Sequence, residues 1–320
     1  MPDVAWIGGR VFAAARRIRE VRAVRFWRLQ HRLAPYLFIS PFIILFCAFL
    51  LWPLARSLVL SCYKSAGPHR KYFVGLENYA FLLQDRFFWL AVGNTVGYAL
   101  VFLAIQIPAA LLLAVLLNSR RIVLRPIWRL AFFSTHLVGG AFVGILFIQI
   151  LNPRYGLLNQ SLSLLLRRPV EIQWLQEPKL AMVSVLLAGL WLYVGHAMVY
   201  YLAALQAVDR DLYEAAAVDG AGRVARFWHI TLPGVRHVTA FLTLFGLIGT
   251  LQMFELPYLL HGQSAGPANS AMTIVTFLYI AGFQAGDLGL ASAVGWILVL
   301  LTAGLALLHL RTAQMLGRRG

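Results

Sequence analysis

The stretch EAAAVDGAGRVARFWHITLP, residues 214–233, is a polar segment in a chain that is otherwise strongly apolar. It places five ionisable side chains within sixteen residues, namely Glu214, Asp219, Arg223, Arg226 and His229. The whole chain of 320 residues is 60% hydrophobic and 12% charged, with a mean hydropathy of +0.74. This composition is typical of a membrane protein. The side of the bilayer on which the polar segment lies therefore sets the orientation of the membrane spans.

Six apolar runs are each long enough to cross a hydrocarbon core of about 30 Å, which needs roughly 20 helical residues. They lie near residues 34–58, 91–117, 127–151, 180–206, 237–260 and 288–310. A seventh run, residues 271–283, has only thirteen residues, a length that favours an interfacial or re-entrant piece over a span. The sequence therefore predicts an all-α membrane protein with six transmembrane helices.

The positively charged residues indicate the orientation, because cytoplasmic loops are enriched in Lys and Arg. If both termini lie inside, nineteen of the 28 Lys and Arg residues fall on the cytoplasmic side and eight in the opposite loops, with Arg56 near the outer end of the first span. This asymmetry predicts that both termini and the segment 209–237 are cytoplasmic. It also accounts for the net charge of +16 without a nucleic-acid partner.

Three parts of the chain are expected. Residues 1–33 form a basic cytoplasmic segment, residues 34–310 form the six-span domain, and residues 311–320 form a cytoplasmic tail. Within residues 16–32, apolar side chains recur every three residues among arginines. This pattern suits either a helix lying on the anionic inner leaflet or a plain positive-inside anchor, and both remain open.

Motifs for catalysis and for cofactor binding are absent from the sequence. Cys47 lies inside a predicted span and Cys62 beyond it, so the pair suits neither a disulfide framework nor a metal site. The chain has no phosphate-binding G-x-x-x-x-G-K-[ST], no H-E-x-x-H and no G-x-S-x-G. We therefore expect no catalytic residues, no metal and no cofactor bound by this chain.

Polar side chains inside the predicted spans are costly in lipid, so each either bonds a neighbouring helix or faces a water-filled path. They are Asn94, Gln106, His136, Gln149, His196, Gln252, Glu255 and His309. Glu255 is the only acidic residue clearly within a span, which makes it a candidate for a functional site.

The polar segment itself reads as a helix-turn-helix. Asp211 is placed to cap a short helix in which Glu214 completes a variant of the capping box. Gly220 ends that helix, since glycine commonly takes the left-handed conformation after a helical C-terminus. A second short helix carries Phe227 and Trp228, and Pro233 limits it. Small residues, an acid, two arginines and two aromatics would then be exposed, a composition that suits docking into a groove of a partner.

The same residues resemble a known family. Glu214-Ala215-Ala216, Asp219-Gly220-Ala221, Phe227, Ile230 and Leu232-Pro233 look like the EAA loop of permease subunits of bacterial ABC importers. GLENY at 75–79, NPRYGLLNQ at 152–160 and DLGLASA at 287–293 are similar to the carbohydrate-uptake branch, with its maltose-type and glycerol-phosphate-type permeases. One departure is His237, where many relatives have a second proline.

The resemblance implies a type I ABC importer permease in the bacterial cytoplasmic (inner) membrane. Its partners would be a second related permease, two ATPase subunits that bind ATP and Mg, and an extracytoplasmic binding protein that delivers a sugar-like substrate. The EAA loop would be the coupling element seated in a cleft of the ATPase. Disaccharides, oligosaccharides, polyols and glycerol 3-phosphate all remain open as substrates.

The resemblance also implies where the substrate passes. In maltose-type relatives the substrate contacts come from the spans on either side of the coupling loop, and Tyr193, His196, Thr250, Gln252 and Met253 fall at or beside such positions. We add Glu255 to this path because of its charge. The alternative is a stand-alone secondary transporter or channel, which would need internal repeats, discontinuous helices or several intramembrane carboxylates.

Overall fold

The computed structural model describes residues 33–65, 71–119 and 122–317, with side chains described as far as residue 312. Residues 16–32, for which an interfacial helix and a plain positive-inside anchor are both open, lie outside the described residues. The chain forms two compact units, Met1–Val59 and Leu60–Gly320, and each is described by itself.

The described part of the first unit belongs to one helix, Leu33–Leu60, which corresponds to the predicted span 34–58. A π turn, η1 (Cys47–Leu51), interrupts it before it continues as α2 (Trp52–Leu60). The turn is closed by the Trp52 N–H, which donates to the Cys47 carbonyl five residues earlier. The π turn widens the helix next to Pro53, whose ring would clash with the carbonyl four residues before it in a regular α-helix.

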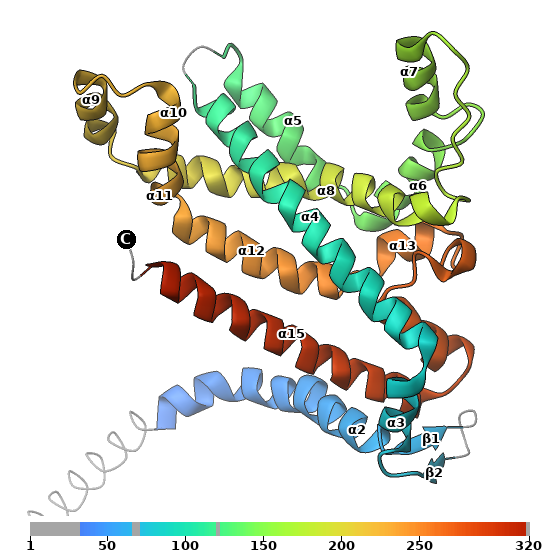
Figure 1. The fold of residues 1–320 in the computed structure, drawn as a ribbon. Helices are drawn as coiled ribbons and strands as arrows, with labels where there is room; N and C mark the ends of the chain where they lie inside the picture. Colours follow the sequence, from blue (N-terminus) through green and yellow to red (C-terminus); the bar gives the residue numbers. More distant parts are fainter. Residues whose placement is uncertain (1–32, 66–70, 120–121, 318–320) are drawn as a thin grey trace, which may run out of the picture. The chain divides into compact units, whose positions relative to one another are not determined.

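The second unit begins with a small hairpin and contains three long helices (Figure 1). In the hairpin, β1 (Tyr63–Ser65) pairs antiparallel with β2 (Lys71–Phe73), and α3 (Glu77–Gln84) follows. The long helices are α4 (Arg86–Asn118), α8 (Pro178–Ala207) and α15 (Leu288–Gly317). They confirm the predicted spans 91–117, 180–206 and 288–310.

The third predicted span is a broken helix. It consists of α5 (Arg125–Leu137) and α6 (Gly140–Ile150), which meet at an angle of 102°. Gly139 has an extended backbone, with φ −62° and ψ 147°, at the point where the direction changes. Adjacent glycines at 139 and 140 weaken a helix because glycine loses the most backbone entropy in it. The prediction of one continuous span over residues 127–151 is therefore wrong.

The fifth predicted span is also discontinuous. Helical residues 223–234 bend by 63° into α12 (Arg236–Leu251), and an irregular stretch, residues 252–254, separates α12 from α13 (Glu255–Leu260). Pro257 explains this second break, because its ring would clash with the Met253 carbonyl if the helix continued. In the first turn of a new helix, where it stands, proline is tolerated. The prediction of a continuous span over residues 237–260 is wrong for this reason.

The remaining elements are short. They are α7 (Leu157–Leu166), the helices α9 to α11 described below, η3 (Pro267–Asn269) and a helix made of α14 (Ile274–Tyr279) and η4 (Ile280–Gln284). Within the described residues, four helices can cross a membrane by length and composition, or six if each bent pair counts as one span. The predicted six-span fold is confirmed, with two of its spans bent, and the run near 271–283 forms only a short helix.

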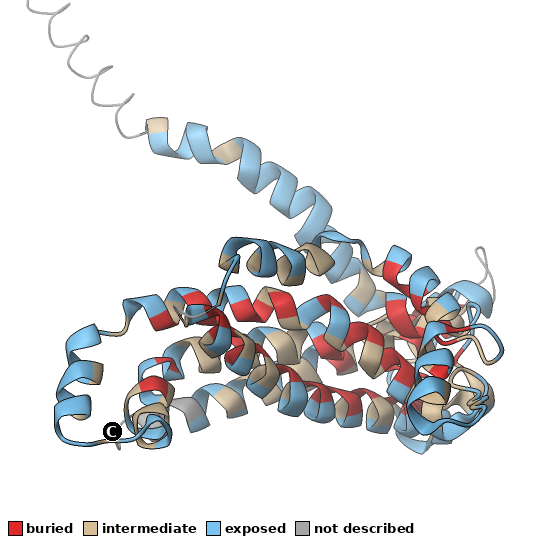
Figure 2. Cartoon of the chain, turned by 90° about the horizontal axis from the view of Figure 1, so that it is seen from above, coloured by how far each residue is buried: buried red, intermediate tan, exposed pale blue. Residues whose placement is uncertain are grey.

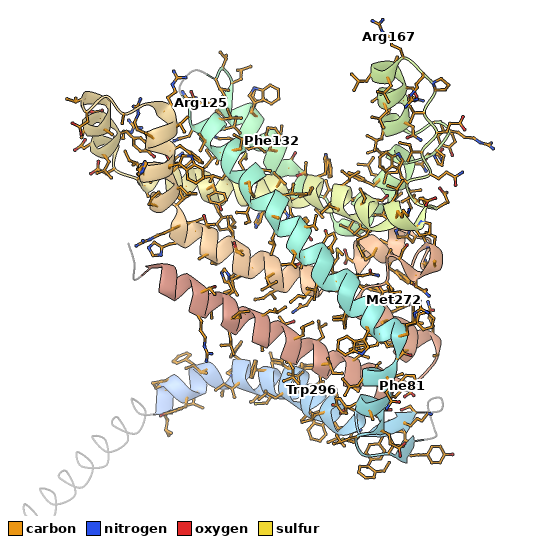
Figure 3. The ribbon with its side chains drawn as sticks, in the orientation of Figure 1. Phe81, Arg125, Phe132, Arg167, Met272 and Trp296 are labelled. Carbon is orange, nitrogen blue, oxygen red and sulfur yellow. The ribbon has the colours of Figure 1, made fainter. Side chains whose placement is uncertain are left out.

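Close helix packing forms the core of the second unit. Gly189 of α8 lies against Tyr98 and Phe102 of α4. Gly195 of α8 lies against the backbone carbonyl of Phe132 in α5, a residue labelled in Figure 3. Small residues at such crossings let helices approach closely, which drives association in lipid. Buried residues gather on the faces where these helices meet, while outer faces are exposed (Figure 2).

Candidate functional site

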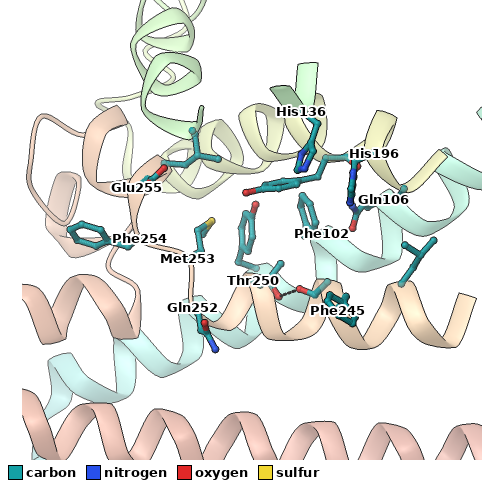
Figure 4. A pocket seen from close by; sticks show the side chains of 18 of the residues that line it. Phe102, Gln106, His136, His196, Phe245, Thr250, Gln252, Met253, Phe254 and Glu255 are labelled. Carbon is teal, nitrogen blue, oxygen red and sulfur yellow. Dashed lines mark hydrogen bonds between the residues drawn. The ribbon is translucent and has the colours of Figure 1, made fainter. Parts of the chain in front are cut away.

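A cavity of about 630 Å³ lies between the broken helices and their neighbours (Figure 4). Its lining comes from α4, α5, α6, α8, α12, the break at 252–254 and α13. Sites for small molecules in proteins usually enclose roughly 300–1,000 Å³. The cavity is therefore of a size for one small molecule, and it exists because two of the predicted spans are not continuous.

Aromatic rings form much of the cavity wall. Tyr98 and Phe102 of α4 stack with their ring centroids 5.4 Å apart, and Tyr193 of α8 meets Phe102 edge to face at 6.2 Å. On another side, Phe241 and Phe245 of α12 lie 4.5 Å apart between centroids. Flat aromatic faces of this kind pack against the apolar C–H faces of a sugar ring, and Tyr adds a polar hydroxyl.

Two histidines from different helices stack within the cavity. The rings of His136, in α5, and His196, in α8, have centroids 4.0 Å apart and an interplanar angle of 27°. The Nδ1 atoms of both rings are buried without a hydrogen-bond partner among the described residues, as is Oε1 of Gln106. Gln106 holds its place by donating from Nε2 to the Tyr193 carbonyl at 3.3 Å. These three unpaired polar atoms are buried within the cavity wall, so a ligand hydroxyl could pair with them only after a side chain has moved.

Hydrogen bonds from a distant segment support the break at residues 252–254. The Thr273 hydroxyl donates to the Met253 carbonyl at 3.0 Å and accepts from the Thr276 N–H at 3.2 Å, which caps α14. The Thr95 hydroxyl of α4 in turn accepts from the Ile274 N–H at 3.0 Å. Because the broken backbone has lost part of its helical bonding, these contacts hold the cavity wall in one arrangement.

Glu255 lies at the junction of the two broken helices. It is the first residue of α13, and it packs against Gly140, the first residue of α6. A Cβ atom added at Gly140 would come within 2.6 Å of the Glu255 Oε2 atom. The amino-terminal end of a helix such as α6, which has eleven residues, carries partial positive charge and stabilises a nearby carboxylate. Gly140 therefore leaves the space in which this carboxylate sits.

All six residues predicted for the substrate path line this cavity: Tyr193, His196, Thr250, Gln252, Met253 and Glu255. They do not all point toward the same part of the cavity, since the Gln252 side chain points away from the histidine pair (Figure 4). The Thr250 hydroxyl is already occupied, because it donates to the Gly246 carbonyl at 2.8 Å.

Several lining residues were not predicted for this path. Gln106 and His136 stood out in the sequence as polar residues within spans, and that signal could have placed them in the cavity. Tyr98, Phe102 and Phe245 carried no signal, because an aromatic residue in a transmembrane helix faces lipid or protein equally well by composition.

The polar segment forms a second candidate site at the opposite end of the second unit from α13 (Figure 1). Here α9 (Arg210–Val218) has no buried residue, and Val218 is 89% exposed. Asp209, and not the predicted Asp211, caps the helix, because its carboxylate accepts from the Asp211 N–H at 3.0 Å. Asp211 instead lies in the first turn, where a negative charge also suits the helix dipole.

Gly220 closes α9 as predicted. Its φ of +76° is left-handed, the Gly220 N–H donates to the Ala217 carbonyl, and the Ala221 N–H donates to the Ala216 carbonyl at 2.8 Å. These two bonds form a Schellman motif, which satisfies carbonyls at a helix end. The compact turn positions Glu214, Ala215, Asp219 and Gly220 on an exposed element, and Ala216 and Ala221 are half-buried.

The second half of the segment anchors the first. It runs as α10 (Arg223–Arg226), the π turn η2 (Phe227–Thr231) and α11 (Leu232–Gly234), which contains Pro233. Phe227 and Leu232 pack against the core formed by α4, α8 and α12, and Ile230 is half-buried. The prediction that both aromatics are exposed is therefore wrong for Phe227, whereas Trp228 is 59% exposed.

A hydrogen bond between side chains connects the exposed helix α9 to the anchored second half of the segment. The hydroxyl groups of Tyr213 in α9 and Thr231 in η2 lie 3.0 Å apart and share a hydrogen bond. The segment is thus an exposed helix held by an anchored one. In the part of the chain that the structure describes, no group of three or more His, Cys, Asp or Glu side chains could hold a metal ion.

Comparisons with known proteins point in one direction. Residues 106–319 match the family described as the binding-protein-dependent transport system inner membrane component. The chain is 35% identical over 291 residues to an arabinooligosaccharides transport system permease protein of Bacillus subtilis, covering 89% of this chain and 91% of that protein. It is 35% identical over 280 residues to a lactose transport system permease protein of Rhizobium radiobacter, covering 87% and 93%.

A solved structure shares the fold. It is a bacterial alginate ABC transporter in complex with an alginate pentasaccharide-bound periplasmic protein. The similarity has a TM-score of 0.76 and a sequence identity of 25%, and it covers 92% of this chain and 98% of the other.

Proposed function

This chain belongs to the family of binding-protein-dependent transport system inner membrane components, and we propose how its two sites divide the work of an importer. The protein is the transmembrane permease of an ABC importer for sugars and is not itself an enzyme. In our proposal, α9 and its anchor transmit the movement of a partner ATPase, and the cavity provides one half of the path for the substrate.

The coupling role rests on the structure of the polar segment. An exposed helix carrying Glu214, Ala215, Asp219 and Gly220 offers a small-residue face to a partner, and side chains such as Phe227 and Leu232 connect it to the packed helices. Such a helix can insert into a groove without large side chains keeping the two backbones apart. Movement of the partner would then reach α4, α8 and α12 through the anchored half.

The transport role rests on the cavity, and this is the observation that carries the proposal. It brings together every residue predicted for the path, and its wall combines aromatic faces with polar side chains. A sugar presents the complementary surface of apolar C–H faces edged by hydroxyl groups. Because the cavity lies between helices that are broken or bent, small movements of those helices would open it toward one side or the other.

The proposed assembly contains this permease, a second related permease, two ATPase subunits that bind ATP and Mg, and a binding protein that delivers the sugar. This chain binds no cofactor in our proposal. Both termini and α9 lie in the cytoplasm, so α9 faces the ATPases, while α13 and α7 lie toward the binding protein.

The names of the relatives indicate the chemical class of the substrate but not one particular sugar. Two of them are permeases for arabinooligosaccharides and lactose, and the solved neighbour is an alginate transporter. We propose a carbohydrate substrate on this basis.

ATP-dependent uptake by the reconstituted importer tests the proposal. The proteoliposomes contain the permease pair and the ATPases and are supplied with the binding protein. They should accumulate labelled sugar only when ATP is present on the side of the membrane that carries the ATPases. Uptake by this polypeptide alone, driven by an ion gradient, would instead support a secondary transporter. Broken helices are also expected in secondary transporters, so the fold alone does not separate the two classes. The uptake experiment separates them directly.

A further inference from the structure

We propose that the cavity selects sugars that carry no negative charge, with Glu255 as the residue that rejects acidic ones. The inference rests on the proposed function, since it takes the cavity as the sugar path, and it adds the class of sugar. It would exclude uronate-containing, sulfonated and phosphorylated sugars, and it would retain neutral oligosaccharides and polyols.

The first argument is the charge of the lining. Among the described residues that line the cavity, Glu255 is the only acidic one, and none is Lys or Arg. Proteins that recognise carboxylates and phosphates use Arg or Lys for this purpose, because an anion taken out of water needs a compensating charge. The part of the path formed by this chain offers an anion no such partner.

The second argument is the position of Glu255. The carboxylate lies against the first residue of α6, and a side chain at Gly140 would displace it. It therefore already occupies the end of α6 that could otherwise attract an anionic ligand. Glu255 is exposed, so an acidic sugar in the cavity would meet its like charge directly, with solvent screening only part of the repulsion.

The stacked histidines cannot both supply the missing positive charge. With ring centroids 4.0 Å apart, His136 and His196 would repel each other if both were protonated. The other titratable groups that line the cavity are the phenols of Tyr98, Tyr193 and Tyr200, which donate hydrogen bonds but carry no positive charge.

The same groups suit hydroxyl groups well. The Glu255 carboxylate accepts hydrogen bonds, and each neutral imidazole ring offers one donor and one acceptor. A sugar hydroxyl both donates and accepts, so it can pair with all of them, whereas a carboxylate or phosphate group only accepts. The cavity thus favours a ligand with hydroxyl groups by hydrogen bonding as well as by charge.

Saturation-transfer NMR on the purified importer complex tests this selectivity without the binding protein. The probes are maltotriose and its derivative in which one terminal primary alcohol is oxidised to a carboxylate. We expect transfer to maltotriose and about tenfold weaker binding of the acid in the wild type. Glu255→Gln should narrow the difference several-fold, because it removes the charge at nearly constant shape.

The control variant is Glu77→Gln, which removes a carboxylate at the start of α3, outside the cavity, and should leave the difference unchanged. Equal binding of acid and maltotriose by the wild type would overturn the inference, as would an unchanged difference in Glu255→Gln. Absence of transfer to maltotriose, together with absence of ATP-dependent uptake of any sugar, would instead refute the proposed function itself.

Discussion

The exposed helix α9 and the cavity differ in how the sequence builds them. The shape of α9 comes from neighbours in the chain, since Asp209 caps it and Gly220 closes it within a dozen residues. The cavity comes from residues far apart in the chain, such as His136 and His196 or Glu255 and Gly140. Damage to the first should therefore affect coupling while the cavity survives, and damage to the second should affect substrate binding or folding while α9 survives.

Gly220→Pro should have the largest effect on uptake. Proline cannot adopt a φ of +76° and has no N–H to donate to the Ala217 carbonyl, so the turn after α9 would be lost at a cost of about 3 kcal/mol or more. We expect uptake to fall to background and the ATPase subunits to dissociate, measured by transport and co-purification.

The matched control is Gly222→Ala, because Gly222 has no positive φ and no atom within 4 Å of an added Cβ. It should retain most of the uptake. Normal assembly and transport by Gly220→Pro would remove the docking role from α9.

Gly195→Ala should be the next most harmful change, and it acts on the packing beside the cavity. A Cβ at this position would overlap the Phe132 carbonyl, so α5 and α8 would separate, at a cost of about 1–3 kcal/mol. We expect a lower yield of folded permease and a lower unfolding temperature. Gly97→Ala on α4, where an added Cβ meets no atom within 4 Å, should change neither quantity. Equal stability of the two variants would argue against the close crossing of α5 and α8.

His196→Phe should weaken substrate binding but leave assembly intact. The ring is kept and its nitrogen atoms are lost, so one hydrogen bond to a ligand, worth about 1 kcal/mol, disappears. The concentration for half-maximal uptake should rise roughly five- to tenfold. Gln252→Ala should have a smaller effect, because the Gln252 side chain points away from the histidine pair. A larger effect of Gln252→Ala than of His196→Phe would place the ligand at the other edge of the cavity.

The smallest effect on uptake is expected for Thr273→Val, which lowers stability without removing a contact to the ligand. This change preserves shape but removes the hydrogen bond to the Met253 carbonyl and the cap of α14, a loss of about 1–2 kcal/mol. The unfolding temperature of the complex should fall slightly and uptake should decrease with it. Thr312→Val on α15 is the control, since the Thr312 hydroxyl donates to the His309 carbonyl of its own helix. If the two variants were equally stable, the hydrogen bond from Thr273 to the Met253 carbonyl would contribute little to the stability of the complex.

The same difference between local and distant contacts explains what could be predicted. The number of spans and the turn at Gly220 follow from hydropathy and from glycine chemistry, which are local properties. The breaks at residues 138–139 and 252–254 were missed, because Gly139-Gly140 and Pro257 are also tolerated in continuous transmembrane helices. Only the packed structure shows that here they end helices.

The cavity was predicted in part. Glu255 could be assigned because a carboxylate is rare in a span. His196 and Gln252 stood out as polar residues within spans, and the resemblance to known permeases assigned both to the path together with Tyr193, Thr250 and Met253. The aromatic wall could not be assigned from the sequence, because apolar periodicity is weak in a helix that is hydrophobic on all sides.

Photo-crosslinking from two exposed positions tests the central claim most directly, namely that α9 carries the contact with the ATPase. A photoreactive amino acid is placed at Val218 of α9, which is 89% exposed, or at Leu164 of α7, which is 80% exposed and lies toward the other end of the second unit. In the assembled importer, Val218 should crosslink to the ATPase subunit and Leu164 should not. A crosslink to the ATPase from Leu164, or none from Val218, would contradict the account.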